Sequence, residues 1–363
     1  MAETYFTTGG TGFIGRRLVE RLVSSGARVK CLARATSNRR RLEELGVEIV
    51  EGDLFSAEAL ARGVADADFV LHVAGVTREL RPGDFLRANC EGAKSVASAC
   101  LRVSETSGKT PILVAVSSLA CGGPAPKADE SAADVEIYAG RRLRRETDVP
   151  APSSPYGRSK LAGELALQEF AAKLPITIVR PPYVFGEGDA TSAPLYRMAK
   201  RRGAFVLPGW ADRFFSFVHV DDLIDVILQS ARCGERLTPT SLATTRDRPK
   251  ECSGVGIYFA TSPKPILFSE YGRMIGRAFG RSKTRSFHIP PVAVGVAGLW
   301  GELVKRATKK APPFDWNKAV EALHGPWICS GAKAANELGV EIPDDLEQKF
   351  ERTARWYERE GLI

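Results

Sequence analysis

TGGTGFIG, at residues 8–15, follows a β-rich stretch at 4–8 and precedes a helical pattern. Glycine can adopt positive φ, and it lets a pyrophosphate approach the backbone because no Cβ stands in the way. The unpaired N–H groups and the positive dipole end of the following helix can then bind the anion. A strand before the glycines and a helix after them support such a motif. We therefore predict a dinucleotide site at Gly9, Gly12, Phe13, Ile14 and Gly15; the alternative is a purely structural turn.

Beyond this turn the chain alternates predicted strands and helices. Strands are expected at 28–33, 47–50, 68–73, 111–116 and 258–260, and helices at 13–25, 57–65, 84–104, 155–173, 192–202, 269–279, 291–307, 316–323 and 344–359. This alternation predicts an α/β fold with a doubly wound parallel sheet of the Rossmann type and a smaller C-terminal substrate lobe. We expect residues 1–181 plus 217–262 to form the dinucleotide-binding domain, and residues 182–216 plus 263–363 to form the substrate-binding lobe.

Composition excludes several other classes of protein. The chain has 363 residues, 44% of them hydrophobic, which is enough for a large core. The formal net charge is +8, but no basic-aromatic repeat is present, so we do not expect nucleic-acid binding. Seven scattered cysteines and four widely spaced histidines predict neither disulfides nor a metal site. The first strand begins within a few residues of Met1 and leaves no room for a signal peptide, so we expect a cytoplasmic protein.

The longest apolar stretch spans residues 289–300, which is shorter than the ~20 residues that a membrane-spanning helix needs. We predict that it belongs to a buried or substrate-lining helix. Peripheral contact with a membrane surface is the less favoured alternative, suggested by Lys305, Lys309 and Lys310 after the stretch. The candidates for lining an apolar substrate pocket are Phe214, Phe215, Trp300 and Trp316.

The residue after the second predicted strand bears on the choice of cofactor. A carboxylate there accepts the ribose hydroxyls of NAD, whereas an arginine favours the extra phosphate of NADP. The chain has Arg34 at this position, with Ser37, Asn38 and Arg39 close behind. Because a guanidinium pairs bidentately with a phosphate, we expect NADP, with NAD as the alternative if Arg34 only stacks on the adenine.

Candidate catalytic residues follow the strand predicted at 111–116. Ser117 and Ser118 lie at its carboxyl end, where ligands bind in open α/β sheets. After a loop of about thirty residues, long enough to act as a lid, Tyr156 and Lys160 lie four apart on one helix face. An ammonium near a phenol lowers its pKa, so Tyr156 could exchange a proton with a carbonyl or alcohol oxygen as hydride moves. The alternative is an exposed helix start.

The motifs together resemble those of extended short-chain dehydrogenases/reductases, in the group similar to NAD-dependent epimerases and dehydratases. The matching segments are TGGTGFIG at 8–15, GDL at 52–54, HVAG at 72–75, VSSLACGG at 116–123, PYGRSK at 155–160, RPPYVFGEGD at 180–189 and FVHVDDL at 217–223. Within this group the chain is similar to dihydroflavonol reductases and 3β-hydroxysteroid dehydrogenases, which act on hydrophobic ketones and alcohols. Residues 32–54 also resemble hopanoid-associated sugar epimerase-like proteins, whose name does not establish a reaction.

The resemblance implies roles for individual residues. Ser118 matches the serine that binds the reacting oxygen, Tyr156 the acid/base, Lys160 its partner, which also binds the nicotinamide ribose, and Asn89 a supporting asparagine. Relatives often form homodimers through the helices that contain Asn89 and Lys160. The further cofactor contacts that the resemblance implies are Asp53 and Leu54 at the adenine, Ala74 and Gly75 at the ribose and phosphates, and Pro181 and Val184 at the nicotinamide carboxamide.

Two departures from related enzymes narrow the predicted function. Sugar 4,6-dehydratases carry Thr-Asp-Glu where this chain has Ser118-Leu119-Ala120, so the carboxylates for water elimination are missing. Nucleotide-sugar epimerases usually carry an arginine where this chain has Phe215, although Arg213 could substitute. We therefore favour an oxidoreductase that transfers hydride between NADP(H) and a hydrophobic ketone or secondary alcohol. A nucleotide-sugar epimerase with tightly bound NAD(P) is the alternative; a non-catalytic sensor is disfavoured because both Tyr156 and Lys160 are present.

Overall fold

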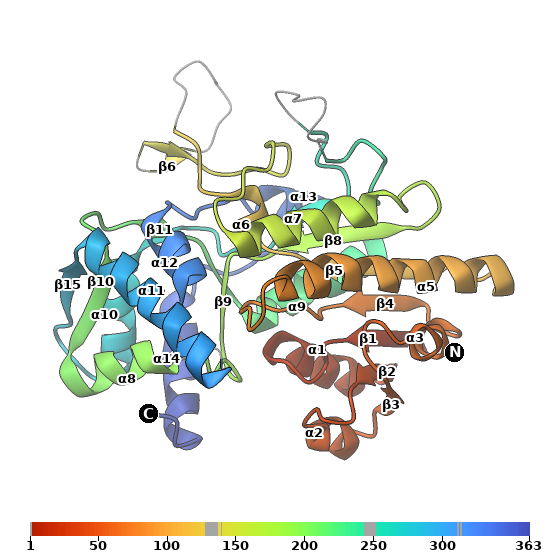
Figure 1. The fold of residues 1–363 in the computed structure, drawn as a ribbon, viewed down its shortest axis with the longest axis horizontal. Helices are drawn as coiled ribbons and strands as arrows, with labels where there is room; N and C mark the ends of the chain where they lie inside the picture. Colours follow the sequence, from red (N-terminus) through yellow and green to blue (C-terminus); the bar gives the residue numbers. More distant parts are fainter. Residues whose placement is uncertain (1, 128–136, 139, 243–251, 311, 313) are drawn as a thin grey trace.

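The centre of the fold is a seven-stranded parallel sheet (Figure 1). The computed structural model describes residues 2–127, 137–138, 140–242, 252–310, 312 and 314–363. In spatial order the strands are β13 (Ile257–Phe259), β8 (Ile176–Arg180), β5 (Ile112–Val116), β4 (Phe69–His72), β1 (Thr4–Thr8), β2 (Arg28–Ala33) and β3 (Glu48–Glu51). Every neighbouring pair is parallel. This confirms the predicted doubly wound sheet and places the reversal of strand order between β1 and β4.

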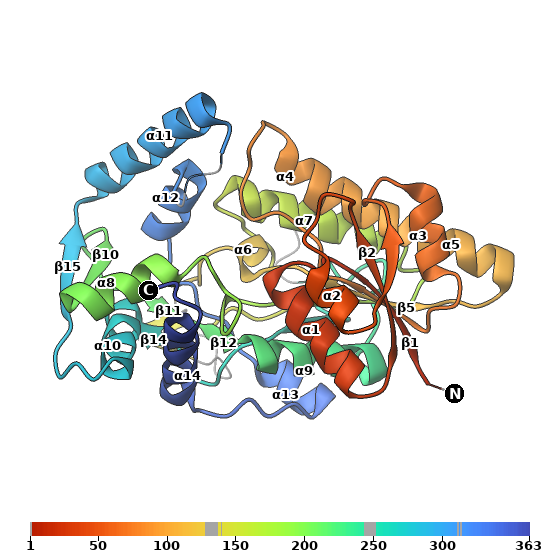
Figure 2. The ribbon, with the colours of Figure 1, turned by 90° about the horizontal axis from the view of Figure 1, so that it is seen from below.

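Helices cover both faces of this sheet (Figure 2). Leu18 and Leu22 pack with Ile224 in the core on one face, whereas Leu60 packs with Val96 in the core on the other. Full burial of a side chain of this size stabilises the fold by roughly 1.5–3 kcal/mol. The helices of the first face are α1 (Phe13–Ser24), α9 (Val220–Cys233) and α13 (Ala332–Leu338), those of the second are α3 (Ala57–Val64), α5 (Gly92–Ser107) and α7 (Pro155–Gln168), and short helices α2 (Arg40–Glu44) and α6 (Leu119–Gly122) follow β2 and β5.

The long helix predicted at 84–104 is interrupted near its start. Helix α4 (Asp84–Leu86) leads into a π-helical turn, η1 (Arg87–Glu91), and only then into α5. Single π turns inside helices are frequent at functional sites. Here the π turn carries Asn89, whose side chain is buried.

A smaller lobe adjoins the sheet (left side of Figure 1) and is built around buried aromatic rings. Tyr196, Phe205, Phe217, Tyr271 and Phe350 form the centre of its core. The helices of the lobe are α8 (Ala193–Arg202), α10 (Phe268–Ala278), α11 (Pro291–Thr308), α12 (Trp316–Leu323) and α14 (Leu346–Arg359). The remaining strand pairs are β9 (Tyr183–Phe185) with β12 (Phe217–His219), β10 (Ala204–Pro208) with β15 (Arg285–Ile289), β11 (Phe214–Phe215) with β14 (Ile266–Leu267), and β6 (Ile137–Tyr138) with β7 (Arg141–Arg142). The loop predicted after Ser118 lies partly outside the described residues.

The C-terminal helix is more than the surface cover that its charge suggests. Phe350, Ala354 and Tyr357 of α14 recur at spacings of four and three and are fully buried in the core of the lobe. Residues at this spacing share one helix face, so a mostly charged helix can still supply core side chains. The composition of the helix hides this narrow stripe because polar residues surround it.

Helix α11 is not the buried helix that its composition predicts. Val292 is 78% exposed and Trp300 is 67% exposed, whereas only Val294, Gly298 and Gly301 of this helix are buried. Trp316, at the start of α12, is 43% exposed. Within the described ranges, no helix combines the length and the apolar character needed to cross a bilayer.

Candidate active site

The glycine turn between β1 and α1 packs directly against the chain that leaves β4. Gly9 has φ +81°, and a Cβ built there would lie 2.6 Å from the amide nitrogen of Ala74. A Cβ at Gly15 would lie 2.1 Å from the carbonyl oxygen of Gly9. Gly12 occupies the N-cap of α1 and provides no side-chain cap, so N–H groups of the first turn remain available to an anion. This cradle, at the reversal of strand order, fits a dinucleotide pyrophosphate.

Other residues predicted to contact the dinucleotide lie close to the glycine turn or to the carboxyl edge of the sheet. Ile14 packs against the core on the α1 face, and the Phe13 ring lies 3.2 Å from a Cβ built at Gly188. Val184 is paired with Val218 between β9 and β12. The carbonyl oxygen of Pro181 accepts a hydrogen bond from the Leu119 amide at 2.8 Å, which joins the end of β8 to the residue after Ser118. Ala74, Pro181 and Val184 therefore all follow or continue strands near the carboxyl edge of the sheet.

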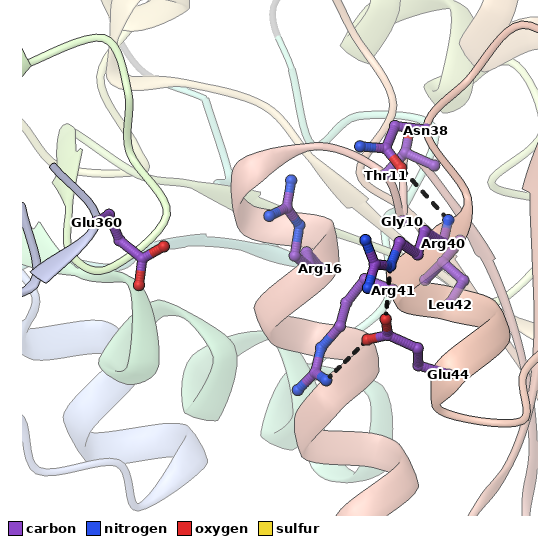
Figure 3. Close-up of a pocket in the computed structure, with 9 residues that line it drawn as sticks. All are labelled: Gly10, Thr11, Arg16, Asn38, Arg40, Arg41, Leu42, Glu44 and Glu360. Carbon is purple, nitrogen blue, oxygen red and sulfur yellow. Dashed lines mark hydrogen bonds and ion pairs between the residues drawn. The ribbon is translucent and has the colours of Figure 1, made fainter. Parts of the chain in front are cut away.

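A cavity of about 440 Å³ lies beside the glycine turn at the predicted adenosine end (Figure 3). Arg16, one helical turn into α1, projects toward it, and no ion pair is recorded for this arginine in the described chain. Arg41 also lines the cavity and pairs with Glu20 at 2.8 Å. The full lining is Gly10, Thr11, Arg16, Asn38, Arg40, Arg41, Leu42, Glu44 and Glu360. Its cationic side chains can bind a phosphate.

Three residues predicted for the adenosine end, Arg34, Asp53 and Leu54, do not line this cavity. Arg34 is exposed just after β2 and does not line the cavity. The Asp53 carboxylate accepts hydrogen bonds from the Phe55 amide at 2.9 Å and the Ser56 hydroxyl at 2.9 Å. These hydrogen bonds hold the pKa of Asp53 below its ordinary value. Leu54 packs toward Gly92, where a Cβ would lie 2.7 Å from its Cδ1. Sequence reasoning named Asn38 but missed Arg16, whose only signal was its position directly after the last glycine.

Tyr156 lies in the first turn of α7, and several contacts hold it there. The Ser154 hydroxyl caps the helix by accepting from the Gly157 amide at 2.9 Å. The Tyr156 amide donates to the side-chain oxygen of Asn317 at 3.1 Å, and the Phe85 ring centroid lies 5.8 Å from that of Tyr156. Asn317 comes from α12, far along the chain, so sequence reasoning gave no sign of this contact.

We predicted that Lys160, four residues after Tyr156, lowers the pKa of the Tyr156 phenol, but this pKa is raised. Burial raises the pKa of Tyr156, the charge of Glu321 raises it further, and a hydrogen bond with Ser118 opposes both. The Lys160 ammonium is turned toward the end of β5 and donates to the carbonyl oxygen of Val116 at 2.8 Å. Burial lowers the pKa of Lys160 to about 8, opposed by the charge of Glu164. The first turn of α7 packs closely against the segment after Ser118, since a Cβ built at Gly157 would lie 2.4 Å from the carbonyl oxygen of Ala120.

Asn89 and Gly75 lie beside Lys160. The Asn89 side chain accepts from the Val76 amide at 2.9 Å and donates to the Ser159 hydroxyl at 2.9 Å. A Cβ at Gly75 would lie 2.8 Å from Oδ1 of Asn89 and 3.6 Å from Nζ of Lys160. The π turn thus ties the chain after β4 to α7, and the absence of a side chain at Gly75 leaves Lys160 accessible from this side.

A buried ion pair under the site anchors α7 to the sheet. Arg180, at the end of β8, donates to both carboxylate oxygens of Glu164 at 3.0 and 2.6 Å. Burial alone would raise the pKa of Glu164, but the charge and hydrogen bonds of Arg180 lower it. The Cys121 thiol also donates to Glu164 at 3.1 Å. Because Glu164 follows Lys160 by one helical turn, this pair fixes the position of the helix that carries Tyr156 and Lys160.

A cluster of potential metal ligands lies elsewhere, at the start of α9. Potential ligand atoms of Glu187, His219 and Asp221 lie within 4.8 Å of one another. The Arg352 guanidinium contacts this cluster, pairing with Glu187 at 2.5 Å and with Asp221 at 2.6 Å, and Arg17 pairs with Asp221 at 2.7 Å. Two guanidinium groups neutralise the carboxylates, so the cluster works as an ion-pair network that joins α1, α9 and α14.

Two relatives align with this chain over nearly their whole length. A profile of the NAD dependent epimerase/dehydratase family matches residues 6–239. The chain is 29% identical to a ceramide reductase of Caulobacter vibrioides, in a match that covers 98% of this chain and 95% of that protein. It is 27% identical to a 4-hydroxy-2-methyl-3-oxo-4-farnesyl-3,4-dihydroquinoline-1-oxide ketoreductase of Stigmatella aurantiaca, over 92% of this chain and 90% of that protein.

Solved structures show the same fold. A dTDP-glucose 4,6-dehydratase of Streptomyces venezuelae with bound NAD superposes with a TM-score of 0.71 at 19% identity, covering 99% of this chain and 100% of that chain. A UDP-glucose 4-epimerase of Thermotoga maritima gives a TM-score of 0.68 at 18% identity, covering 98% and 99% of the two chains. With the family profile matching well over half of the sequence, the chain belongs to the NAD dependent epimerase/dehydratase family and is an NAD(P)-dependent enzyme of the extended short-chain dehydrogenase/reductase type.

Proposed function

We propose that this enzyme is an NADP(H)-dependent oxidoreductase that interconverts a hydrophobic ketone and a secondary alcohol, with Ser118, Tyr156 and Lys160 as its catalytic residues. The observation that carries the proposal is the contact between the first turns of α7, which carry Tyr156 and Lys160, and the end of β5, which Ser118 follows: the Lys160 ammonium donates to the carbonyl oxygen of Val116 at 2.8 Å. This contact brings Tyr156 and Ser118 to the same end of the sheet, where both hydroxyls can act on one carbonyl oxygen.

In the direction of reduction, Tyr156 donates its phenolic proton to the carbonyl oxygen of the substrate. Ser118 donates a hydrogen bond to the same oxygen and holds it in place. Lys160, as an ammonium, stabilises the phenolate that Tyr156 leaves behind. A bound nicotinamide supplies the hydride in this direction and accepts it in the other. Asn89 positions Ser159 and the chain at Val76 around these groups.

The proposed dinucleotide contacts follow the turn and its neighbours. Gly9, Gly12 and Gly15 leave room for the pyrophosphate at the start of α1. The preference for NADP over NAD is supported by the cationic cavity beside the turn, because Arg16 and Arg41 line it. We extend the sequence-based proposal accordingly: Arg34 is exposed just after β2, whereas Arg16 lines the cavity and is the guanidinium that we expect to meet the additional phosphate. We also propose that residues 1–181 plus 217–262 bind the dinucleotide and that residues 182–216 plus 263–363 bind the substrate.

The side chains around Ser118 favour an apolar substrate. Leu119, the next residue, packs with Phe259, Trp327 and Cys329, and Phe215 packs against this cluster. Phe215 is the residue that replaces the expected diphosphate-binding arginine, while Arg213 donates to the carbonyl oxygen of Pro208 at 2.9 Å. The names of the relatives agree, since ceramide and a farnesylated ketone are both largely apolar.

The test is reduction of long-chain β-keto compounds followed by NADPH absorbance, with Tyr156→Phe as the key variant. We expect kcat to fall by about a hundredfold or more, because general acid catalysis contributes roughly 10²–10⁴-fold. Tyr5→Phe is the matched control: it removes a phenol hydroxyl that bonds Glu3, and it lies on β1 away from the carboxyl ends. Unchanged activity of Tyr156→Phe contradicts the proposed mechanism.

A nucleotide-sugar epimerase remains the second candidate because solved structures with this fold include such epimerases. It predicts a nicotinamide cofactor that stays bound through purification and thermal stabilisation by UDP-sugars. The reductase proposal predicts exchangeable cofactor, tighter fluorescence-detected binding of NADPH than of NADH, and no stabilisation by UDP-sugars. For the cofactor arm, Arg16→Ala should weaken NADPH binding by about tenfold or more and leave NADH binding within about threefold.

A further inference from the structure

Helix α11 presents a continuous apolar stripe to solvent. Val292, Val296, Leu299 and Leu303 recur at spacings of four, three and four, which places them on one helix face. Their exposed fractions are 78%, 60%, 54% and 55%, and Trp300 beside them is 67% exposed. Scattered exposed apolar residues are ordinary, but a contiguous stripe of this kind marks an interaction surface.

The opposite face of α11 already has its partner. A Cβ at Gly298 would lie 2.7 Å from Cβ of Ala319 on α12, and a Cβ at Gly301 would lie 2.1 Å from the carbonyl oxygen of Phe314. The small residues let the two helices approach closely, as Figure 2 shows for α11 above α12. The exposed stripe is therefore not needed to hold α11 on the lobe, and its burial requires another occupant.

Charge at the end of α11 indicates which occupant this is. Arg306, Lys309 and Lys310 are exposed, and no ion pair is recorded for them in the described part of the chain. Glu302 is the single acidic residue of the helix, and Lys305 pairs with it at 2.6 Å. A second copy of α11 would offer apolar side chains but no unpaired carboxylate for this basic end. A bilayer with anionic headgroups offers acyl chains for the stripe and phosphates for the basic residues.

We propose that α11 is a membrane-contact helix that lies in the headgroup region of an anionic bilayer. The stripe inserts toward the acyl chains, Trp300 lies at the interface, where indole rings are favoured, and the basic C-terminal end pairs with lipid phosphates. Helix α4, on the same side of the molecule in Figure 2, carries Leu86, which is 52% exposed.

The helix pair also connects this surface to the candidate active site. Asn317 and Glu321 on α12 accept hydrogen bonds from the Tyr156 amide at 3.1 Å and the Ser154 hydroxyl at 2.9 Å. With α11 in the bilayer, α12 would link the membrane surface to the first turn of α7, and we infer that a ketone dissolved in the bilayer is delivered to the site from this side. This route rests on the proposed function, whereas membrane binding itself does not.

The first test is flotation of the purified full-length protein with vesicles of phosphatidylcholine, alone or mixed with phosphatidylglycerol. We expect binding to the mixed vesicles, and Leu299→Glu/Leu303→Glu should weaken it by at least about tenfold per leucine, from the transfer free energy of each side chain. Ala297→Glu is the matched control, because Ala297 is exposed on the same helix but outside the stripe. It places one carboxylate on α11 and should still bind.

The charge arm uses Arg306→Gln/Lys309→Gln/Lys310→Gln. Binding to anionic vesicles should weaken by about fivefold per residue and become less sensitive to salt, while binding to neutral vesicles stays unchanged. Equal vesicle binding by the wild type and the stripe variant overturns the proposal. It is also overturned if the wild type binds no vesicles and sedimentation shows that the stripe substitutions turn a dimer into a monomer, since the stripe is then covered by a second copy.

An activity arm separates this inference from the proposed function. With NADPH, the stripe variant should reduce a short water-soluble ketone at the wild-type rate, but a long-chain ketone delivered in vesicles several times more slowly. If neither protein reduces any ketone while the flotation results hold, the reductase assignment fails and the membrane contact stands. Equal rates on the vesicle substrate contradict the entry route.

Discussion

Removal of the Glu164 charge should destabilise the protein strongly, because it leaves Arg180 as an unpaired charge in the interior. The side chains of Arg180 and Glu164 are only 1% and 2% exposed, and Arg180 donates to the two carboxylate oxygens at 3.0 and 2.6 Å. Breaking a buried ion pair by removing one partner costs about 3–5 kcal/mol. Folded domains have about 5–15 kcal/mol of stability in total, so Glu164→Gln should lose about a fifth of it or more.

Urea unfolding at neutral pH, followed by tryptophan fluorescence, measures this loss. The exposed pair of Lys94 and Glu169, at 3.0 Å, provides the control just beyond the end of the same helix. Glu169→Gln should change stability by less than about 1 kcal/mol, because solvent screens exposed pairs. The double variant Glu164→Leu/Arg180→Leu should recover part of the loss, since no charge then stays buried. A loss of less than about 1 kcal/mol for Glu164→Gln would refute the reasoning. It would also be refuted if the double variant lost as much stability as Glu164→Leu and Arg180→Leu together.

Three further predictions test the electrostatics and geometry of the site region. Burial raises the pKa of Glu146 to about 7, so the stability that its protonated carboxyl contributes is lost as pH rises from the ordinary pKa through 7. At pH ~8, the free energy of unfolding of Glu146→Gln should therefore exceed that of the wild type by up to about 3 kcal/mol. At pH ~5, thermal unfolding should show little difference between the two proteins. Because burial lowers the pKa of Lys160 to about 8, the rate of ketone reduction should fall as pH rises through 8 and the ammonium is lost; a flat alkaline profile would show that this charge is not required. Asn317→Ala removes the side-chain oxygen that accepts a hydrogen bond from the Tyr156 amide. In steady-state kinetics it should lower kcat about fivefold and leave the KM for NADPH unchanged. A change in KM alone would show that Asn317 contributes to cofactor binding and not to the position of Tyr156.

Local patterns in the sequence predicted most of the fold. The alternation of strands and helices gave the parallel sheet, and the glycines at 9–15 gave the turn at its centre. These predictions succeeded because a glycine with positive φ and a helix that begins after it are determined by neighbouring residues. The interrupted helix around Asn89 was missed because a π turn leaves the apolar periodicity nearly unchanged.

The order of the elements, the glycine turn and the presence of a serine, a tyrosine and a lysine typical of this family could thus be predicted from local patterns. The electrostatic surroundings of these residues and the exposed surfaces of the lobe became visible only once the chain was folded. It brought Asn317 to the amide of Tyr156, paired Glu164 with Arg180, and left one face of α11 in solvent. The physical reason is that burial, charge pairing and exposure depend on which distant segments meet, whereas periodicity and turn chemistry depend on residues within a few positions of one another.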